Sequence, residues 1–462
     1  MIGASFARVD KFMSLFDDLF YSPAVREIFS DGNRLLRMLD FEVALAKAEA
    51  ECGVVPATAA IAIAAVSKTF TPDIRTIARK AAQAGNPALP LIQELTVAVK
   101  ERDPGAARYV HWGATSQDVI DTGIVLQARE AFDWMEVELH SLCAELATFA
   151  DRHRETIMPG RTWLQHALPI TLGWKAAEWL DAMLRHKVRL REVRERALAL
   201  QFGGAAGTLA AFGDEGRAVS EKLARKLGLA QPDIAWHTSR DRVSEIAAGL
   251  GLISGTLGKI AKDISLLMQT EIAEAFEAAG AGRGTSSTMP QKRNPVLCSV
   301  ILAAAARVPA LVATALSSMV QEHERGLGNW QTEWETLPEI FNLTAGALER
   351  ARELIAGLEV DRERMRANLD LAHGLIMAEA VSMALAPRVG KNSAHEIVQR
   401  ACRVAAEKRK HLREVLQEDA EIGKLIDNAE LDRLFDPSGY LGVTQKSIDR
   451  VLDRAAAEEE GS

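Results

Sequence analysis

The sequence predicts an all-α protein built around a central bundle of long helices. Leu, Val and Ala recur at three- and four-residue intervals through most of the chain, as in helices with one buried face. Period-two runs of β-branched residues are scarce, and no internal repeat or low-complexity tract interrupts the pattern. With 462 residues, the chain is long enough to bury a large core in two or three compact units.

The first clear helix is expected over residues 33–53. Leu36, Leu39 and Val43 lie on one face of this segment, and Gly53 is a typical residue for ending a helix. Longer Ala- and Leu-rich stretches follow, and they cover residues 119–151, 168–202, 241–279, 296–321 and 337–357. Helices of these lengths typically pack as a bundle.

We therefore expect three helical domains in chain order. An N-terminal domain covers residues 1–112, the long-helix bundle covers residues 113–365, and a smaller C-terminal domain covers residues 366–462.

Composition excludes several classes of protein. A net charge of −8 and a pI near 5.8 leave no basic excess for binding nucleic acid. The first twenty residues contain three aspartates where a signal peptide needs an apolar run, and we expect no later run of membrane-spanning length. The four cysteines are widely spaced and show no metal-binding pattern. A cytoplasmic protein without metal or other cofactor, and without a membrane partner, is expected.

Four breaks between the predicted helices are chemically dense. Three of them carry reactive side chains, and the glycine-rich one supplies flexible backbone that can approach a ligand closely. The four breaks read HWGATSQD (111–118), GRTWLQHA (160–167), QFGGAAGT (201–208) and GTSSTMPQKRNP (284–295). Each also has a purely structural interpretation. Thr115, Ser116 or Asp118 could cap a helix, His166 could be an interior histidine, and the fourth segment could be a linker.

The stretch SSTMPQKRNP resembles the signature loop of the fumarase/aspartase superfamily. The resemblance extends from YSPAVREIFSD near the start of the chain to NLDLAHGLIMAEAV near its end. It implies a homotetramer whose active sites are each assembled from three subunits. It also implies chemistry in which a proton is removed next to a carboxylate and a leaving group departs from the neighbouring carbon, or the reverse addition.

The same resemblance implies roles for individual residues. Ser286 matches the catalytic serine, Lys292 and Asn294 match groups that hold the substrate carboxylate, and His111 matches an active-site histidine. Further substrate contacts are expected from Thr115, Ser116, Gln165, His166 and Ser287. A serine is a poor base at neutral pH, so Ser286 needs a donor-rich, cationic loop, which Lys292 supplies. One departure is Thr285, where the family usually has glycine.

Two further departures indicate the leaving group. The lyases of the superfamily read GRTH where this chain has Trp163, and they pair that histidine with a glutamate at the position of Ser299. Losing a general acid costs about 10² to 10⁴ in rate when the leaving group is strongly basic, but a carboxylate leaves unaided. A carboxylate leaving group within the same molecule makes the enzyme a lactone-forming cycloisomerase acting on a small polycarboxylate.

A last set of changes concerns phosphate binding. Adenylosuccinate lyases have serine and arginine in the segment that reads HERGLGNWQTEW here, and Phe20-Tyr21 replaces their Arg-Tyr pair. Arg325 in this segment is a candidate for binding a second carboxylate. Trp163, Trp330 and Trp334 either line a pocket for a planar acid or belong to the core.

Three alternatives stay open. The substrate could carry a sulfonate in place of one carboxylate, the chain could be a divergent adenylosuccinate-type lyase, or it could be a catalytically silent relative.

Overall fold

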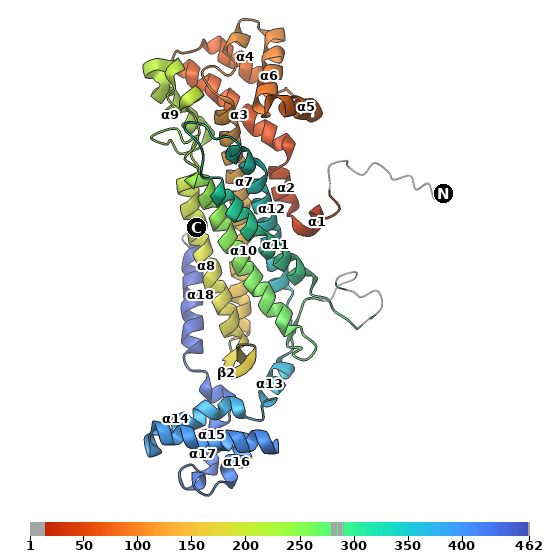
Figure 1. The fold of residues 1–462 in the computed structure, drawn as a ribbon, viewed down its shortest axis with the longest axis vertical. Helices are drawn as coiled ribbons and strands as arrows, with labels where there is room; N and C mark the ends of the chain where they lie inside the picture. Colours follow the sequence, from red (N-terminus) through yellow and green to blue (C-terminus); the bar gives the residue numbers. More distant parts are fainter. Residues whose placement is uncertain (1–13, 279–283, 285–288, 290, 461–462) are drawn as a thin grey trace, which may run out of the picture. The chain divides into compact units, whose positions relative to one another are not determined.

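The prediction of an all-α protein is confirmed. The computed structural model describes residues 14–278, 284, 289 and 291–460, and most of these residues are helical (Figure 1). In that part of the chain, the strands form two short antiparallel pairs, β1 with β2 and β3 with β4, and one isolated bridge joins Ala199 and Ala230.

The elements follow one another in the order of Figure 1. The N-terminal helices are α1 (Asp17–Phe20), α2 (Pro23–Ile28), α3 (Asp31–Glu51), α4 (Ala57–Ser67), α5 (Ile74–Ala84) and α6 (Ala88–Arg102). The long helices are α7 (Ser116–Arg152), α8 (Leu172–Ala197), α10 (Asp241–Leu267), α11 (Val296–Ser317) and α12 (Asn329–Ala356), and α9 is the shorter Gly216–Leu227. The strands are β1 (Ile157–Thr162), β2 (Gln165–Thr171), β3 (Ala275–Phe276) and β4 (Glu359–Val360). The C-terminal helices are α13 (Arg362–Asp370), α14 (Ala378–Val389), α15 (Lys391–Lys408), α16 (Leu412–Glu418), α17 (Asn428–Leu434) and α18 (Thr444–Glu460).

The chain divides into two compact units. Unit 1 contains residues 1–139, 186–258 and 300–349, and unit 2 contains residues 140–185, 259–299 and 350–462. All five boundaries between the units fall inside long helices, namely α7, α8, α10, α11 and α12. The expected division at residues 112 and 365 stays a prediction.

Helix α3 shows why the N-terminal segment is helical where the sequence predicts it. The Ser30 hydroxyl accepts a hydrogen bond from the Asn33 amide at 3.2 Å and so satisfies a free N–H at the start of the helix. The buried face packs against α4 and α9 in unit 1. This otherwise apolar face also contains the carboxylates of Glu42 and Glu49, which are both buried.

Residues 157–171 form a hairpin, so the helix expected over 168–202 begins later, at Leu172. Strand β1 pairs with β2, and Thr162 lies opposite Gln165, which leaves only Trp163 and Leu164 in the turn. Both turn residues have positive φ, at 52° and 63°. A two-residue turn of this type normally contains Asn-Gly, so the sequence contains no ordinary turn signal here.

Two other boundaries also differ from the sequence-based expectation. Helix α10 ends at Leu267 and the segment expected to continue it contains the short strand β3. Helix α12 begins at Asn329, eight residues before the expected start at 337, and it continues through Pro338. Proline disfavours the helix interior, but Pro338 lies within α12 here.

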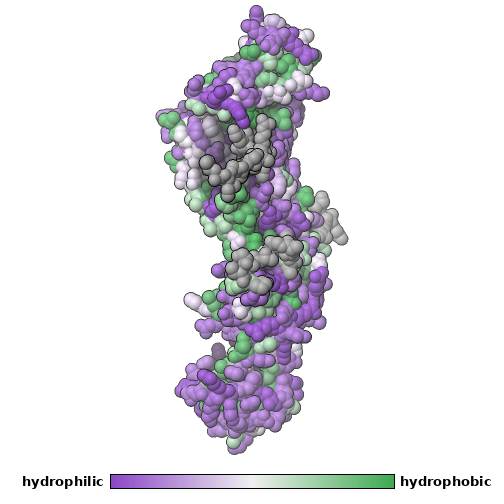
Figure 2. Space-filling model, turned by 90° about the vertical axis from the view of Figure 1, so that its right-hand side faces the viewer, coloured by the Kyte–Doolittle hydropathy of each residue, from purple (hydrophilic) through white to green (hydrophobic). Residues whose placement is uncertain are grey.

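Helix α11 contradicts the expectation that no run reaches membrane-spanning length. Its 22 residues are long and apolar enough to cross a membrane, and 33% of its most apolar stretch is buried within the chain. The core helix of a water-soluble protein meets the same criterion of length and composition. On the face drawn in Figure 2, hydrophobic residues form patches among hydrophilic ones.

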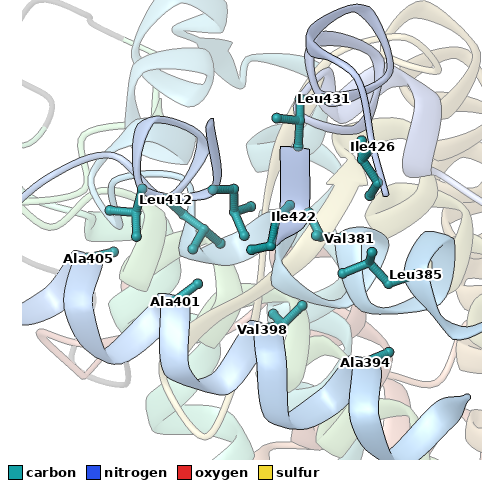
Figure 3. Close-up of a cluster of buried hydrophobic side chains, with 12 residues drawn as sticks. Val381, Leu385, Ala394, Val398, Ala401, Ala405, Leu412, Ile422, Ile426 and Leu431 are labelled. Carbon is teal, nitrogen blue, oxygen red and sulfur yellow. The ribbon is translucent and has the colours of Figure 1, made fainter. Parts of the chain in front are cut away.

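The C-terminal part of unit 2 has its own hydrophobic core. Ala394, Val398 and Ala401 point from α15 toward side chains of α14 and α16, as Figure 3 shows. Leu385 on α14 lies in the same cluster and is fully buried. This packing gives the segment that follows α13 a fixed structure within unit 2.

The Leu385→Ala substitution should destabilise this core. Removing a fully buried leucine side chain typically costs about 2–5 kcal/mol of the free energy of unfolding. Met383 lies on the same helix but is 57% exposed, so Met383→Ala serves as the matched control. Denaturant unfolding of both variants measures the difference. Equal loss of stability in the two would show that the cluster does not hold this part of the fold.

Candidate active site

A histidine–carboxylate pair lies at the end of the segment before α7. The Nδ1 atom of His111 is 2.7 Å from Oε1 of Glu42, which comes from the buried face of α3. Burial of His111 opposes its protonation, but the charge and hydrogen bond of Glu42, with a smaller effect of Asp118, raise the pKa of His111. His111 has a positive φ of 59°, a backbone conformation uncommon outside glycine. The arrangement favours an imidazolium at this position.

Thr115 and Ser116 lie at the N-terminus of α7, as the capping interpretation predicted. The backbone N–H of Thr115 donates to Oδ2 of Asp118 at 3.0 Å, and Ser116 is the first residue of the helix. The N-terminus of a long helix carries partial positive charge and free N–H groups. The segment can therefore serve both as a cap and as an anion-binding site.

Arg325 approaches the same helix terminus. Its Nη2 donates to the Thr115 hydroxyl and, at 3.4 Å, to the carbonyl of Gly204. Its Nε is buried and has no acceptor among the described residues. A guanidinium with an unused donor is suited to bidentate binding of a carboxylate. The structure therefore brings His111, Thr115, Ser116 and Arg325 together in unit 1.

A buried ion network supports this region. Arg240 donates to Asp121 at 2.7 Å and to Glu333 at 3.0 Å, and Trp330 also donates to Asp121 at 2.9 Å. Burial opposes the charge on Arg240, but the two carboxylates raise the pKa of its guanidinium further above its ordinary value. Burial raises the pKa of Glu333, although the charge of Arg240 opposes this shift. The network fixes α7, α10 and α12 relative to one another within unit 1.

The tryptophans do not share one environment. Trp330 is buried and packs edge-on against Trp334, with ring centroids 4.9 Å apart. Trp163, in contrast, is 96% exposed at the tip of the β1–β2 hairpin, and Leu164 beside it is 81% exposed. The core interpretation therefore holds for Trp330.

The end of β1 next to this turn is held by a buried carboxylate of unit 2. Arg161 makes two hydrogen bonds to Glu274, at 2.6 and 2.9 Å, and Asn368 donates to the same carboxylate at 2.7 Å. Glu274 is fully buried. This arrangement fixes the strands while leaving the tip residues exposed.

Gln165 and His166 line a hollow in unit 2. Its other walls include Leu371, Leu375 and Glu379. Burial, and then the charge of Arg161, lowers the pKa of His166 below its ordinary value. A neutral imidazole in this position can donate or accept a hydrogen bond but adds no charge.

The structure describes only part of the signature loop. Thr285, Ser286 and Ser287 lie outside the described residues, whereas Lys292 is exposed and Asn294 is half-buried. The Asn294 N–H donates to the Gly284 carbonyl at 3.0 Å. Gly284 has a φ of 63°, and a Cβ there would lie 2.7 Å from the Asn294 carbonyl oxygen. This close approach requires glycine.

Glu277 holds the segment that follows the loop. Its carboxylate accepts hydrogen bonds from the N–H groups of Leu297 and Cys298, at 3.0 and 2.8 Å, and so caps α11. Arg293 donates to Glu359 at 2.9 Å and to the Glu277 carbonyl. Lys292 and Asn294 therefore lie on a short segment anchored at both ends within unit 2.

Comparison with known proteins identifies the family. The family model described as "Lyase" matches residues 20–310, and that described as "Adenylosuccinate lyase C-terminus" matches residues 374–451. A 3-carboxy-cis,cis-muconate cycloisomerase of Pseudomonas aeruginosa is 54% identical, with 95% of each chain covered. Its counterpart in Acinetobacter baylyi is 48% identical over 96% of this chain and 99% of that protein. The crystal structure of the 3-carboxy-cis,cis-muconate lactonizing enzyme from Pseudomonas putida matches with a TM-score of 0.91 and 49% identity, covering 96% of this chain and 99% of that chain.

Several residues around the site could not be found by motif. Glu42 and Arg240 lie far from the reactive segments in sequence, and Glu333 lies in the segment of Arg325 without a signal for its partner. One signal existed for Glu42, since it is a charged residue on the apolar face of a predicted helix. Such residues are rarely buried without a partner, which here is His111.

Glu42→Gln should lower the pKa of His111. In the folded protein this pKa lies above its ordinary value of 6.5, so the pair stabilises the fold below that pH. The contribution is lost as the pH rises through the folded pKa. Without the Glu42 charge, burial dominates and the pKa should fall below 6.5. An NMR titration of the His111 ring, assigned with His111→Gln, measures the shift.

Glu51→Gln provides the matched control for this titration. Glu51 is an exposed residue of the same helix and pairs with Lys226 rather than with His111. It should leave the titration of His111 in place. An unchanged pKa in Glu42→Gln would refute the pairing.

Proposed function

The chain belongs to the lyase family of the fumarase/aspartase superfamily, and on that premise we propose that it cyclises 3-carboxy-cis,cis-muconate to 4-carboxymuconolactone. This reaction belongs to the protocatechuate branch of the β-ketoadipate pathway. The observation that carries the proposal is the replacement of the lyase acid pair by Trp163 and Ser299, together with near-full-length similarity to cycloisomerases.

The reaction joins two ends of one molecule. An oxygen of the remote carboxylate forms a bond to the carbon that bears the 3-carboxylate, and the electron pair of the adjacent double bond moves to the neighbouring carbon. That carbon lies next to another carboxylate, which delocalises the charge until a proton is added. A substrate with three carboxylates becomes a lactone with two, so each turnover takes up one proton.

We assign the proton transfer to Ser286. It donates the proton to the carbon during lactonisation and acts as the base in the reverse direction. Lys292, Asn294, Thr115 and Ser116 bind the carboxylate that carries the developing charge. Fixed cationic and N–H donors at that place stabilise the transition state more than the ground state.

The other carboxylates of the substrate need their own partners. We assign one of them to Arg325, whose free donor lies beside Thr115. His111 acts as a catalytic imidazolium that offsets negative charge at the same helix terminus. Gln165, His166 and Ser287 supply further substrate contacts.

The absence of an acid pair fits this leaving group. In the reverse direction a carboxylate departs, and it needs no proton because it is a weak base. The Ser299 hydroxyl already donates to the Val296 carbonyl at 2.7 Å, and Trp163 presents an apolar indole. Trp163 therefore acts through shape and exclusion of water.

We also propose a homotetramer in which subunits share active sites. The exposed Trp163 and Leu164 occupy a two-residue turn with unfavourable backbone angles, which is the kind of strain found at functional positions. Helix α11 is strongly apolar but only one third buried within its own chain. A second copy of the chain that covers these surfaces would bury the apolar side chains of the turn and of α11.

A cytoplasmic location is proposed with it. Cys52, Cys143, Cys298 and Cys402 form no disulfide bonds, which fits a reducing compartment.

The purified protein should consume 3-carboxy-cis,cis-muconate. Loss of diene absorbance measures turnover, and a weakly buffered assay with a pH indicator should show uptake of one proton for each substrate. Adenylosuccinate should not be cleaved, because the segment around Arg325 lacks the phosphate contacts of that lyase. Cleavage of adenylosuccinate without lactonisation would replace this proposal by the lyase alternative. A parallel assay with 3-sulfomuconate measures the preference between sulfonate and carboxylate.

Restoring the lyase pair should bring no gain. Trp163→Phe should retain substantial lactonisation because it keeps an apolar ring, while Trp163→His with Ser299→Glu should not exceed the wild-type rate. The assay is turnover of 3-carboxymuconate at saturating and limiting substrate. An increase of the order of 10², the size of a general-acid effect, would refute the leaving-group argument.

A further inference from the structure

The carboxylate of Asp118 is a buried meeting point of three segments of unit 1. It accepts hydrogen bonds from the N–H groups of Thr115, Gly203 and Gly204, at 3.0, 3.0 and 2.9 Å. His237 Nε2 lies 2.9 Å from Oδ1 of the same group, and Gln201 donates to it at 3.3 Å. The side chain of Asp118 is fully buried. Its oxygens are therefore engaged entirely by protein donors.

Two of the three segments that meet at Asp118 also contact Arg325. Arg325 donates to the Thr115 hydroxyl and to the Gly204 carbonyl. Asp118 fixes the backbone N–H of each of these same residues. The position of the guanidinium therefore depends on a carboxylate that does not contact it.

A second segment braces the loop that carries Arg325. The Thr238 hydroxyl donates to the His323 carbonyl at 2.8 Å, two residues before Arg325. His237, the neighbour of Thr238, pairs with Asp118, and its carbonyl accepts a hydrogen bond from Gln117 at 2.8 Å. The segment thus ties the start of α7 to the loop at 321–328.

Close packing leaves this arrangement little freedom. A Cβ on Gly203 would lie 2.9 Å from the His237 ring, and one on Gly204 would lie 2.9 Å from the Gly113 carbonyl oxygen. Gly204 also has a positive φ of 68°. The glycines of QFGGAAGT let the backbone reach Asp118. This contact gives them a structural role that needs no contact with the substrate.

We propose that Asp118, oriented by His237, is a positioning residue that sets the carboxylate-binding geometry of Thr115 and Arg325. The inference rests on the proposed function, which makes these two residues substrate contacts. A carboxylate suits this position because its two oxygens accept the three backbone N–H groups and the Gln201 amide at once. An asparagine of the same shape would direct its own N–H groups at one set of donors.

The first test is Asp118→Asn in the full-length enzyme. A misplacement of about 1 Å in a substrate-binding group typically costs about 10²-fold in rate, so kcat/KM should fall by about that factor. Thr122→Val is the matched control. Thr122 is buried on the same helix and its hydroxyl bonds the carbonyl and N–H of Gln201, at 2.8 and 3.1 Å. The substitution loosens the same 201–204 segment from a position one turn of α7 after Asp118, and it should keep kcat/KM within about threefold of wild type.

A double-mutant cycle with Arg325→Ala separates positioning from general damage. If Asp118 acts through Arg325, Asp118→Asn should cost far less in the Arg325→Ala background than in the wild type, because the group that it positions is gone. Equal losses in the two backgrounds, or an equal loss in Thr122→Val, would overturn the proposal.

The His237 pair keeps the proposal testable if Asp118→Asn does not fold. His237→Gln retains a donor toward Asp118 and should restore most of the kcat/KM that His237→Ala loses. Equal activity of the two variants would count against the orienting role.

An inactive wild type would refute the proposed function alone. The same variants are then compared by calorimetric binding of tricarballylate, an inert tricarboxylate. Unchanged affinity in Asp118→Asn would overturn the positioning role, and a weakened affinity that depends on Arg325 would support it.

Discussion

The burial of one full positive charge, on Arg240, is the constraint on which unit 1 depends. A buried guanidinium is tolerated only when carboxylates and hydrogen bonds replace the water that it loses, and Asp121 and Glu333 do this from two different helices. Removing either partner would leave buried N–H donors of the guanidinium without their acceptors, so α7, α10 and α12 must keep their positions together. Because Asp121 lies one turn after Asp118, this constraint also fixes the helix terminus that carries Thr115 and Ser116.

The sequence predicts the helices well because each long helix has a continuous apolar face. It fails where local preference and tertiary packing disagree. Residues 163–164 adopt a turn that Asn-Gly would favour, so neither Trp163 nor Leu164 signals the hairpin. The helix expected from residue 337 begins at Asn329, and the buried face of α12 outweighs the local cost of Pro338 within it. The apolar length of α11 was underestimated.

The candidate site also has residues that the sequence predicts and residues that it does not. Residues within a motif, such as His111 and Thr115, could be chosen from the sequence because each short segment gathers several reactive groups. Their partners could not, because Glu42 and His237 reach the site only through folding, from positions 69 and 119 residues away from the groups that they contact. Periodicity marks Glu42 as unusual but cannot name its partner. For Ser286 and Ser287, which lie outside the described residues, the assignment still rests on the resemblance.

The charge of the proposed substrate explains why this site is built as it is. The protein has a net charge of −8, and the proposed substrate is a trianion. The attraction must therefore come from positive groups at the site, since the overall charge repels the substrate. Unit 1 offers the terminus of a 37-residue helix, a histidine whose protonation is favoured by Glu42, and the free donor of Arg325. These groups would offset the charge of the substrate carboxylates. None of them has to protonate the leaving group, because a carboxylate leaves without a general acid. The residue at position 163 then needs no role in proton transfer. An indole there can keep water away from the carbanion intermediate, which must receive one proton at carbon.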